Sequence, residues 1–172
     1  MYEIMIDLET MGNGPNAAIL AIGAVEFDRH LKTIGQVFYI NVDLKSAVAL
    51  GGVIDPDTVM WWMKQSDQSR SAFKGAAINM AIALTTFSQW LHGRCEKKKL
   101  LMWGCGSDFD NVILASAYRN CGLELPWDFW NNRCYRTMKA MNPHVKMERS
   151  GTYHNALDDA RSQAEHLLRI LG

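Results

Sequence analysis

The sequence predicts an α/β protein with a mixed five-stranded sheet flanked by helices. Three segments with strand character open the chain, and the short connections between them indicate an antiparallel meander. Helical patterns then alternate with a short apolar run, which is typical of strands added in parallel. The chain has 172 residues, 48% of them hydrophobic, which is enough for one core, so we expect a single domain over residues 1–172.

The first three strands are predicted from alternation and from turn residues. Residues 2–7 alternate apolar and polar side chains, and a segment rich in glycine, asparagine and proline at 11–16 follows them. Residues 17–28 and 34–42 are the second and third strands in this interpretation. Together they form the antiparallel part of the sheet.

Two helices are predicted after the third strand. Asp55 is a typical N-cap and Pro56 suits the first helical position, so a helix should run from there through Met63. A second helix is expected over residues 77–92. Its predicted core face consists of Ile78, Ile82, Leu84, Phe87 and Leu91.

The second half of the chain alternates strand and helix. Residues 99–104 are apolar without alternation, as expected for a strand that is buried on both faces. A helix over residues 109–121 should follow, with Gly122 at its C-terminal end.

The remaining segments are one weakly patterned region and one clear helix. Residues 126–150 should include a short strand near Arg133 and a helix over roughly 137–141. The last helix is expected over residues 155–171. Its predicted core face consists of Ala156, Ala160, Ala164, Leu167, Leu168 and Leu171.

Charge and cysteine content narrow the class of protein. The net charge is zero, but residues 94–149 carry ten basic and six acidic side chains, which permits a polyanionic partner. No run approaches eighteen apolar residues and no leader pattern is visible, so we expect a cytoplasmic protein without a membrane partner. The cysteines form no C-x-x-C pair, which argues against zinc and redox sites and favours spectator thiols. They are Cys95, Cys105, Cys121 and Cys134.

An acid pair marks the expected end of the first strand. Asp7 and Glu9 fall on the side opposite Ile6 and Leu8. Two neighbouring carboxylates repel each other, and a hard divalent cation with oxygen ligands removes that conflict. A lone D-x-E is more often a solvated strand end, so a metal site needs further acids from elsewhere in the chain.

Two later segments supply such acids. If the strand over residues 99–104 lies parallel beside the first, both end at the same crevice, where ligands of open α/β sheets bind. The segment that leaves this strand carries Asp108 and Asp110. The start of the last helix carries a histidine and two more acids, which are His154, Asp158 and Asp159.

These residues carry a resemblance to a known family. D-L-E-T at residues 7–10, F-D at 109–110 and H-x4-D at 154–159 together resemble the three motifs of the DEDDh, or DnaQ-like, 3′→5′ exonucleases. The resemblance spans nearly the whole chain and implies a ribonuclease H-like fold. The run over residues 56–70 is similar to the small phage and bacterial branch related to exonuclease VIII and a mycobacterial exoribonuclease.

The resemblance implies a two-metal phosphodiester hydrolysis. Asp7, Glu9, Asp110 and Asp159 would hold two Mg²⁺ ions, with Mn²⁺ able to substitute. Glu9 would also lie near the attacking water, and His154 would take a proton from it because imidazole titrates near neutral pH. The implied partner is single-stranded DNA or RNA with a free 3′ end, and the product is a nucleoside 5′-monophosphate.

The neighbouring acids leave a choice at two positions. The family motif selects Asp110 over Asp108. Helical spacing pairs His154 with Asp158 more closely than with Asp159, but only if the histidine is itself helical. A glycine just upstream suggests a loop, so the motif selects Asp159. Asp108 and Asp158 are expected to be exposed.

Substrate contacts are expected beside the acids. Trp61 and Trp62 differ by about 100° on a helix, so one can enter the core while the other stacks on a base. Leu8, Thr10 and Met11 adjoin the metal acids, where residues of the superfamily commonly touch the terminal nucleotide. Aromatic and basic residues also interleave later in the chain, as in a single-strand groove. They are Trp127, Trp130, Arg133 and Arg136.

Two rival classes stay open at this point. A haloacid-dehalogenase-like phosphatase also has an acid pair after its first strand, but it requires D-x-D, from which Glu9 departs. An inactive nucleic-acid-binding module of the same fold is the other rival. Many relatives are dimers, so a homodimer is a further expectation.

Overall fold

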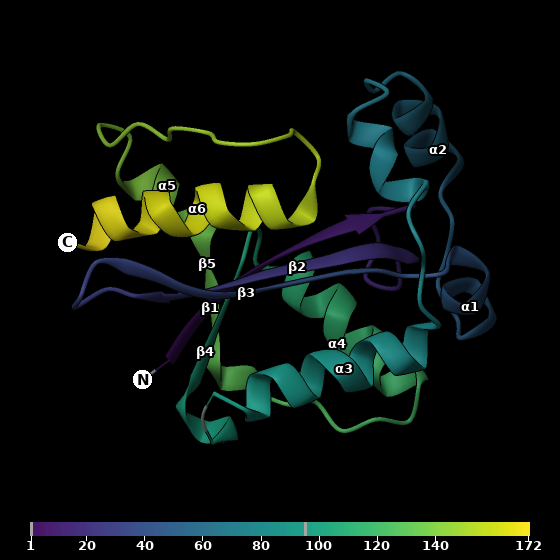
Figure 1. Ribbon diagram of the computed structural model, residues 1–172, viewed down its shortest axis with the longest axis horizontal. Helices are drawn as coiled ribbons and strands as arrows, with labels where there is room; N and C mark the ends of the chain where they lie inside the picture. The colour runs from purple at the N-terminus through teal and green to yellow at the C-terminus, as the bar shows by residue number, and fades with distance from the viewer. Residues whose placement is uncertain (1, 95) are drawn as a thin grey trace.

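The centre of the computed structural model is strand β1 (Tyr2–Thr10), in a five-stranded sheet with the order β3-β2-β1-β4-β5 (Figure 1). The structure describes residues 2–94 and 96–172. Met1 and Cys95, one of the expected spectator thiols, lie outside the described residues. Cys105, Cys121 and Cys134 are half-buried free thiols.

The sheet combines an antiparallel and a parallel half, as the sequence predicts. β1 pairs antiparallel with β2 (Ile19–Asp28), which pairs antiparallel with β3 (Thr33–Asn41). On its other side β1 pairs parallel with β4 (Leu100–Gly104), and β4 pairs parallel with the short edge strand β5 (Asn132–Cys134). The predicted α/β fold class is confirmed.

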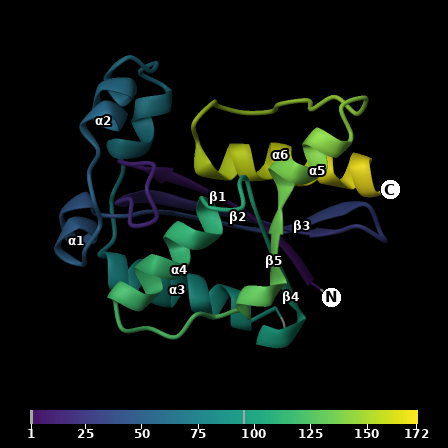
Figure 2. The same cartoon turned by 180° about the vertical axis from the view of Figure 1, so that it is seen from behind.

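Helices cover both faces of this sheet. α5 and α6 lie on one face, α3 and α4 lie on the other, and α1 and α2 lie beyond the end of β1 (Figures 1 and 2). Short 3₁₀ helices precede β4 and β5. The helices are α1 (Leu44–Ala49), α2 (Pro56–Met63), η1 (Ser69–Phe73), α3 (Met80–His92), η2 (Lys97–Lys99), α4 (Asp110–Asn120), η3 (Phe129–Asn131), α5 (Tyr135–Met141) and α6 (Ala156–Leu171).

Each face of the sheet has its own apolar core. The larger core, between the sheet and α3 and α4, includes Ile4, Ile6, Phe87 and Leu114. The smaller core, between the sheet and α5 and α6, includes Trp103. Because β1 is buried against both layers, its position is fixed, and so is the position of the acids near its end.

β1 is longer than the sequence predicts. The predicted strand ends at residue 7, whereas β1 continues to Thr10, with Asp7 opposite Gly23 and Glu9 opposite Ala21 of β2. The apolar β2 offers backbone partners beyond residue 7, and a register shift comes only between Glu9 and Thr10. Both acids therefore lie within the sheet and not beyond its end.

The helix predictions are correct in type and less accurate in detail. α2 begins at Pro56, and Asp55 caps it by accepting a hydrogen bond of 3.0 Å from the N–H of Asp57. α3 begins at Met80, three residues later than predicted, after the N-cap Asn79. Ile82 was expected in the core but is 59% exposed. A helix turns about 100° per residue, so Ile82 lies opposite the buried face, and Ile78, also expected in the core, precedes the helix and is 37% exposed. The buried face consists of Met80, Ala83, Leu84, Phe87 and Leu91.

Helix α1 is absent from the sequence prediction. It has six residues, too few to show a period, and it begins where Asp43 accepts a hydrogen bond of 2.8 Å from the N–H of Ser46. The predicted short strand near Arg133 and the helix that follows it are confirmed as β5 and α5. Gly122, with φ of 65°, lies just past the end of α4, as predicted.

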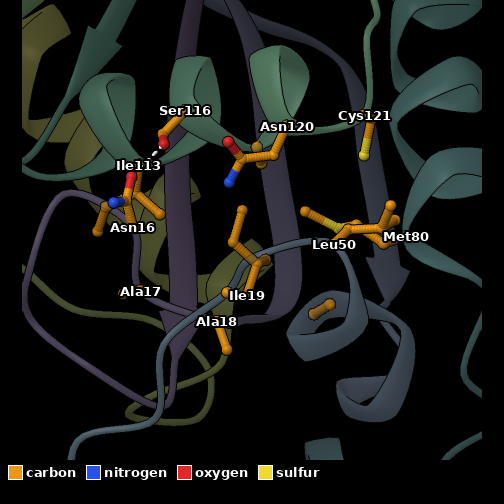
Figure 3. A pocket seen from close by; sticks show the side chains of 13 residues that line it. Asn16, Ala17, Ala18, Ile19, Leu50, Met80, Ile113, Ser116, Asn120 and Cys121 are labelled. Carbon is orange, nitrogen blue, oxygen red and sulfur yellow. Dashed lines mark hydrogen bonds between the residues drawn. The ribbon is translucent and has the colours of Figure 1, made fainter.

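A small cavity lies between the start of β2, α1 and α4. Figure 3 shows Asn16 and Ser116, joined by a hydrogen bond, at one side and the apolar side chains of Ile19 and Met80 nearby. Its volume of about 10 Å³ admits at most a single water molecule. Among the described residues, no helix is long and apolar enough to cross a membrane.

Candidate active site

A cavity of about 460 Å³ opens at the end of β1. The arrowhead of β1 points between α2 and the first turn of α6 in both ribbon views (Figures 1 and 2). Acidic, basic and aromatic side chains line this cavity. They include Asp7, Leu8, Glu9, Thr10, Trp61, Trp62, Cys105, Asp110, Arg136, Arg149, His154, Asp159 and Gln163.

Three of the four predicted acids form a tight group in this cavity. Asp7, Glu9 and Asp159 each offer one carboxylate oxygen, and these oxygens all lie within 4.8 Å of one another. Two come from β1 and one from α6, so the group forms only when the ends of the chain meet. Glu9 and Asp159 are buried, and Asp7 is half-buried.

The close approach of α6 to the sheet depends on Gly23 of β2. Gly23 pairs with Asp7, and a Cβ atom placed on it would overlap the backbone of Ala156 at the start of α6. Asn155 caps this helix by accepting hydrogen bonds of 3.1 and 3.2 Å from the N–H groups of Leu157 and Asp158. A glycine at this position thus lets the first turn of α6 bring Asp159 to β1.

Asp110 lies at the first position of α4 and is 1% exposed. Its carboxylate accepts hydrogen bonds from the N–H groups of Leu8 at 3.1 Å and Cys105 at 2.6 Å. It lines the same cavity but is not part of the three-residue oxygen group. The two backbone bonds hold its carboxylate at the ends of β1 and β4.

The acids disturb one another's protonation. Burial, followed by the charges of Asp110, Glu9 and Asp159, raises the pKa of Asp7 well above its usual value. Burial, with the charges of Asp159 and Asp110, raises the pKa of Glu9 to about 8. Burial raises the pKa of Asp110 to about 6 although its backbone bonds oppose this. In the absence of a cation, the cluster cannot hold all its negative charges at neutral pH.

The donor set fits a hard divalent cation. All the clustered donors are carboxylate oxygens, which Mg²⁺ and Mn²⁺ prefer. Within the described residues, the buried Oε1 atom of Glu9 has no hydrogen-bond partner, although Glu9 is only 6% exposed. A bound cation would supply the missing partner and offset the repulsion, so the residues present fit the metal site that the sequence predicts.

Arg149 brings a positive charge to this cluster. Its guanidinium forms a salt bridge with Asp159 and lies over the ring of Tyr153, 4.5 Å from the centroid. Burial raises the pKa of Asp159, and the Arg149 charge opposes that shift. Sequence reasoning missed this residue because it lies in an irregular loop where spacing carries no signal.

His154 lies in a loop, as the sequence predicts, with an unusual φ of 59°. Its backbone N–H donates a hydrogen bond of 3.2 Å to Oδ2 of Asp159. Its imidazole packs edge-on against Trp61, with ring centroids 4.8 Å apart. The histidine therefore lies at the cavity wall between the acid cluster and an aromatic side chain.

The two tryptophans of α2 have different surroundings. Trp62 is 3% exposed, and its Nε1 donates a hydrogen bond of 2.9 Å to the carbonyl of Thr10. Trp61 is 41% exposed and faces the cavity. Leu8 and Thr10 line the cavity too, whereas Met11 lies at a separate cavity with Leu20 and Phe73. Of the five predicted substrate contacts, Met11 is thus the one that the structure places elsewhere.

The two alternative acids have other surroundings. Asp108 is exposed, as expected. Asp158 was also expected to be exposed, but it is half-buried and accepts a hydrogen bond of 2.7 Å from the N–H of Thr152. It therefore supports the loop that carries His154 and does not join the cluster.

Gln163 is a further residue of the site that sequence reasoning missed. Its Nε2 donates a hydrogen bond of 2.7 Å to Oδ1 of Asp7, and its side chain is 4% exposed. It lies four residues after Asp159 on α6, and therefore on the same face of that helix. This spacing is the signal that would have found it.

Comparisons with known proteins point to a family of nucleases. The model of the 3′-5′ exoribonuclease Rv2179c-like domain matches residues 2–171. An exodeoxyribonuclease of Enterobacteria phage T4 is 26% identical, in a match that covers 80% of this chain and 70% of the relative.

Solved structures share the fold. The nuclease domain of 3′hExo, a DEDDh family member bound to rAMP, matches with a TM-score of 0.67 at 17% identity over 99% of this chain and 91% of that one. The structure of E. coli Exonuclease I in complex with a dT13 oligonucleotide matches with a TM-score of 0.68 at 12% identity. That match covers 98% of this chain and 40% of the longer enzyme.

Proposed function

Because this chain belongs to the Rv2179c-like family of 3′-5′ exoribonuclease domains, we propose that it removes nucleotides one at a time from the 3′ end of single-stranded DNA or RNA. Each step would hydrolyse one phosphodiester bond and release a nucleoside 5′-monophosphate. The observation that carries this proposal is the convergence of Asp7, Glu9 and Asp159 within 4.8 Å in an open cavity.

Asp7, Glu9, Asp110 and Asp159 would hold two divalent cations. When bound, such ions activate water and stabilise the charge that develops on the transferring phosphoryl group. Gln163 keeps the Asp7 carboxylate in place through its hydrogen bond of 2.7 Å. The two backbone hydrogen bonds to Asp110 do the same for that carboxylate.

His154 would act as the general base. It lines the cavity, and its backbone N–H is bonded to Asp159, so its position is tied to that of a proposed metal ligand. In this role the imidazole takes the proton of the attacking water, and Glu9 accepts a second hydrogen bond from the same water. Contact with Trp61 limits the orientations open to the ring.

The terminal nucleotide would lie against α2. Trp61 offers an aromatic surface at the cavity, and a base stacked on it would also cover His154 and exclude bulk water. Leu8 and Thr10 form the neighbouring wall. Thr10 is fixed there because its hydroxyl donates to the carbonyl of Gly12 at 2.6 Å.

A single assay tests the proposed function. Matched DNA and RNA oligomers, single and double stranded and labelled at the 5′ end, are incubated with the protein and Mg²⁺ or Mn²⁺. We expect a ladder of products shortened from the 3′ end, nucleoside 5′-monophosphates in solution, and no reaction in EDTA. His154→Ala should reduce the rate at least about a hundredfold.

The same assay has clear contrary outcomes. Shortening from the 5′ end would contradict the proposed direction. Turnover of phosphomonoesters without cleavage of oligonucleotides would favour a phosphatase. Asp108→Asn is the matched control, because this exposed acid lies outside the cluster and its loss should leave the ladder unchanged.

A further inference from the structure

A positively charged segment leads from the cavity along the free edge of the sheet. Residues 129–147 contain four basic side chains and no acid, although the whole chain has 18 of each. Asp128 and Glu148 flank the segment on either side. It covers η3, β5, α5 and part of the following loop. Such a local excess of positive charge favours a polyanion.

The two arginines of this segment donate hydrogen bonds to backbone carbonyls and not to carboxylates. Arg133 donates to the carbonyls of Trp130 at 3.1 Å and Asn132 at 2.9 Å. Arg136 donates to the carbonyl of Cys105 at 3.0 Å. Over residues 2–94 and 96–172, neither arginine takes part in a salt bridge. Arg136 lies near Asp110, whose pKa its charge lowers, and Arg133 lies further along the edge, so both can bind phosphate groups next to the cavity.

An exposed aromatic pair lies at the start of this edge. Phe129 is 70% exposed and Trp130 is 64% exposed, and their rings meet edge-on with centroids 5.0 Å apart. Neighbouring Trp127, by contrast, is 1% exposed and donates a hydrogen bond to Asn132. Two large aromatic side chains in solvent, beside arginines that form no salt bridge among the described residues, match the composition of single-strand binding surfaces.

The topology joins this pair to the cavity. β5 follows η3 directly and pairs with β4, with Arg133 opposite Trp103 and Cys134 opposite Gly104. β5 is the last strand of the sheet, and Figure 2 shows it running along that edge up to α5. Arg136, in the first turn of α5, lines the cavity. The three residues of β5 span only about 10 Å.

We propose that the part of a single-stranded substrate upstream of its 3′ end follows this edge, which we call the β5 track. Its residues are Phe129, Trp130, Arg133 and Arg136. The arginines bind phosphates, and a base stacks on Trp130 or Phe129. The proposal rests on the proposed exonuclease function, because that function places the 3′ end in the cavity.

The β5 track makes binding depend on substrate length. A stacked strand rises about 3.4 Å per nucleotide, so the 10 Å of β5 and the first turn of α5 correspond to on the order of four nucleotides. A trinucleotide fills the cavity without reaching Trp130. A 20-mer contacts the whole track.

The test compares the two substrates in a variant with Phe129→Ala, Trp130→Ala and Arg133→Ala. For the 20-mer, KM should rise about tenfold while kcat changes less than twofold, since stacking and phosphate contacts are lost away from the reacting atoms. For the trinucleotide, both constants should stay within twofold of the wild type. The matched control combines Leu31→Ala, which is 73% exposed at the tip of the β2–β3 hairpin, with Arg119→Ala.

A binding measurement separates this inference from the proposed function. Fluorescence anisotropy of a labelled 20-mer in EDTA reports affinity without hydrolysis, and Arg133→Ala alone should lower the slope of log Kd against log salt by about 0.7. If the wild type binds the 20-mer through these residues but hydrolyses nothing, the proposed exonuclease function is contradicted, whereas the β5 track is supported as a binding surface.

Two outcomes would overturn the track. One is an unchanged KM and Kd for the 20-mer in the triple variant. The other is that sedimentation shows a dimer for the wild type and a monomer for the triple variant, while the variant keeps its affinity for nucleic acid. The aromatic pair would then be an interface between two copies of this chain.

Discussion

Strand β1 carries buried or half-buried carboxylates near both of its ends, and the two ends differ in the groups that surround these carboxylates. Near the start, Glu3 is 3% exposed, forms a salt bridge with Arg29 and accepts a hydrogen bond of 3.1 Å from Nε1 of Trp103. Near the end, Asp7 and Glu9 face further acids. Glu3 has a cationic partner within the chain, whereas Asp7 and Glu9 face other carboxylates.

The difference separates a structural charge from a functional one. A buried carboxylate that only supports the fold needs its own partners, and Glu3 has them. The acids at the other end cost stability unless a cation arrives from solution. Strand position and residue type are similar at both ends, so the surroundings distinguish the two roles.

The largest effects are expected from removing one carboxylate charge at each end of β1. Asp7→Asn should reduce hydrolysis by about a thousandfold or more, because a metal ligand is lost, yet it should raise thermal stability in EDTA because repulsion is relieved. Glu3→Gln should do the reverse: an activity per folded molecule near that of the wild type, with a free energy of unfolding lower by about 1–3 kcal/mol. Turnover and chemical denaturation measure both. A stable, inactive Glu3→Gln protein would break the distinction.

The next effect comes from the contact that brings the second acid segment to β1. Gly23→Ala places a methyl group against the backbone of Ala156, so α6 must shift and carry Asp159 away from Asp7. We expect a loss of about 1–3 kcal/mol of stability and at least a tenfold loss of activity. Gly14→Ala is the control, since nothing lies within 4 Å of its added Cβ. Full activity of Gly23→Ala would show that the close approach is dispensable.

The pH dependence of the metal-free protein sharpens the comparison further. The pKa of Glu9 is about 8 in the folded protein and 4.5 when the side chain is free in solution. Its burial therefore leaves the free energy of unfolding unchanged below about pH 4.5, lowers it progressively as pH rises, and lowers it most above about pH 8. The melting temperature in EDTA should therefore fall by roughly 5 °C between pH 5 and pH 8.5. Millimolar Mg²⁺ should remove this fall.

Glu9→Gln isolates this contribution, because the variant lacks the titrating group. Its melting temperature in EDTA should change less over the same pH range than that of the wild type. An equal change of melting temperature with pH in the two proteins would show that ionisation of Glu9 does not lower the stability of the metal-free protein.

A smaller effect is expected from Arg149, the residue that partly neutralises the acidic end. Arg149→Met removes its competition for Asp159, so Mn²⁺ should bind on the order of fivefold more tightly, which corresponds to about 1 kcal/mol for a partly exposed ion pair. Titration calorimetry measures the change. Weaker Mn²⁺ binding would instead mean that Arg149 supports the site and does not compete within it.

The smallest effect separates two neighbouring acids. Asp158→Asn keeps an oxygen that can accept from the N–H of Thr152, so turnover should stay within about threefold of the wild type. Asp159→Asn should lose activity as Asp7→Asn does. Similar losses in both variants would show that Asp158 also contributes to the metal site.

Much of the fold was predictable from local patterns. The alternation of the first strands, the N-cap pair Asp55-Pro56 and the apolar run of β4 each report a local preference. The patterns were less accurate where a partner decides the outcome. β1 extends to Thr10 because β2 continues beside it, and Ile82 is exposed because the core packs against the opposite face of α3.

The sequence by itself determined the types of element, their order and the motif acids, because hydrophobic period, capping and turn chemistry act over a few residues. Only the tertiary structure decided which groups surround those acids. Gln163 and Arg149 reach the cluster from segments about 150 residues away from Asp7, and Gly23 matters only because α6 packs on it. The spacing of Gln163 from Asp159 places the two residues on one face of α6, but only the packing of that face against β1 brings Gln163 to Asp7. Arg149 and Gly23 have no such local signal, because their contacts depend on packing between distant segments.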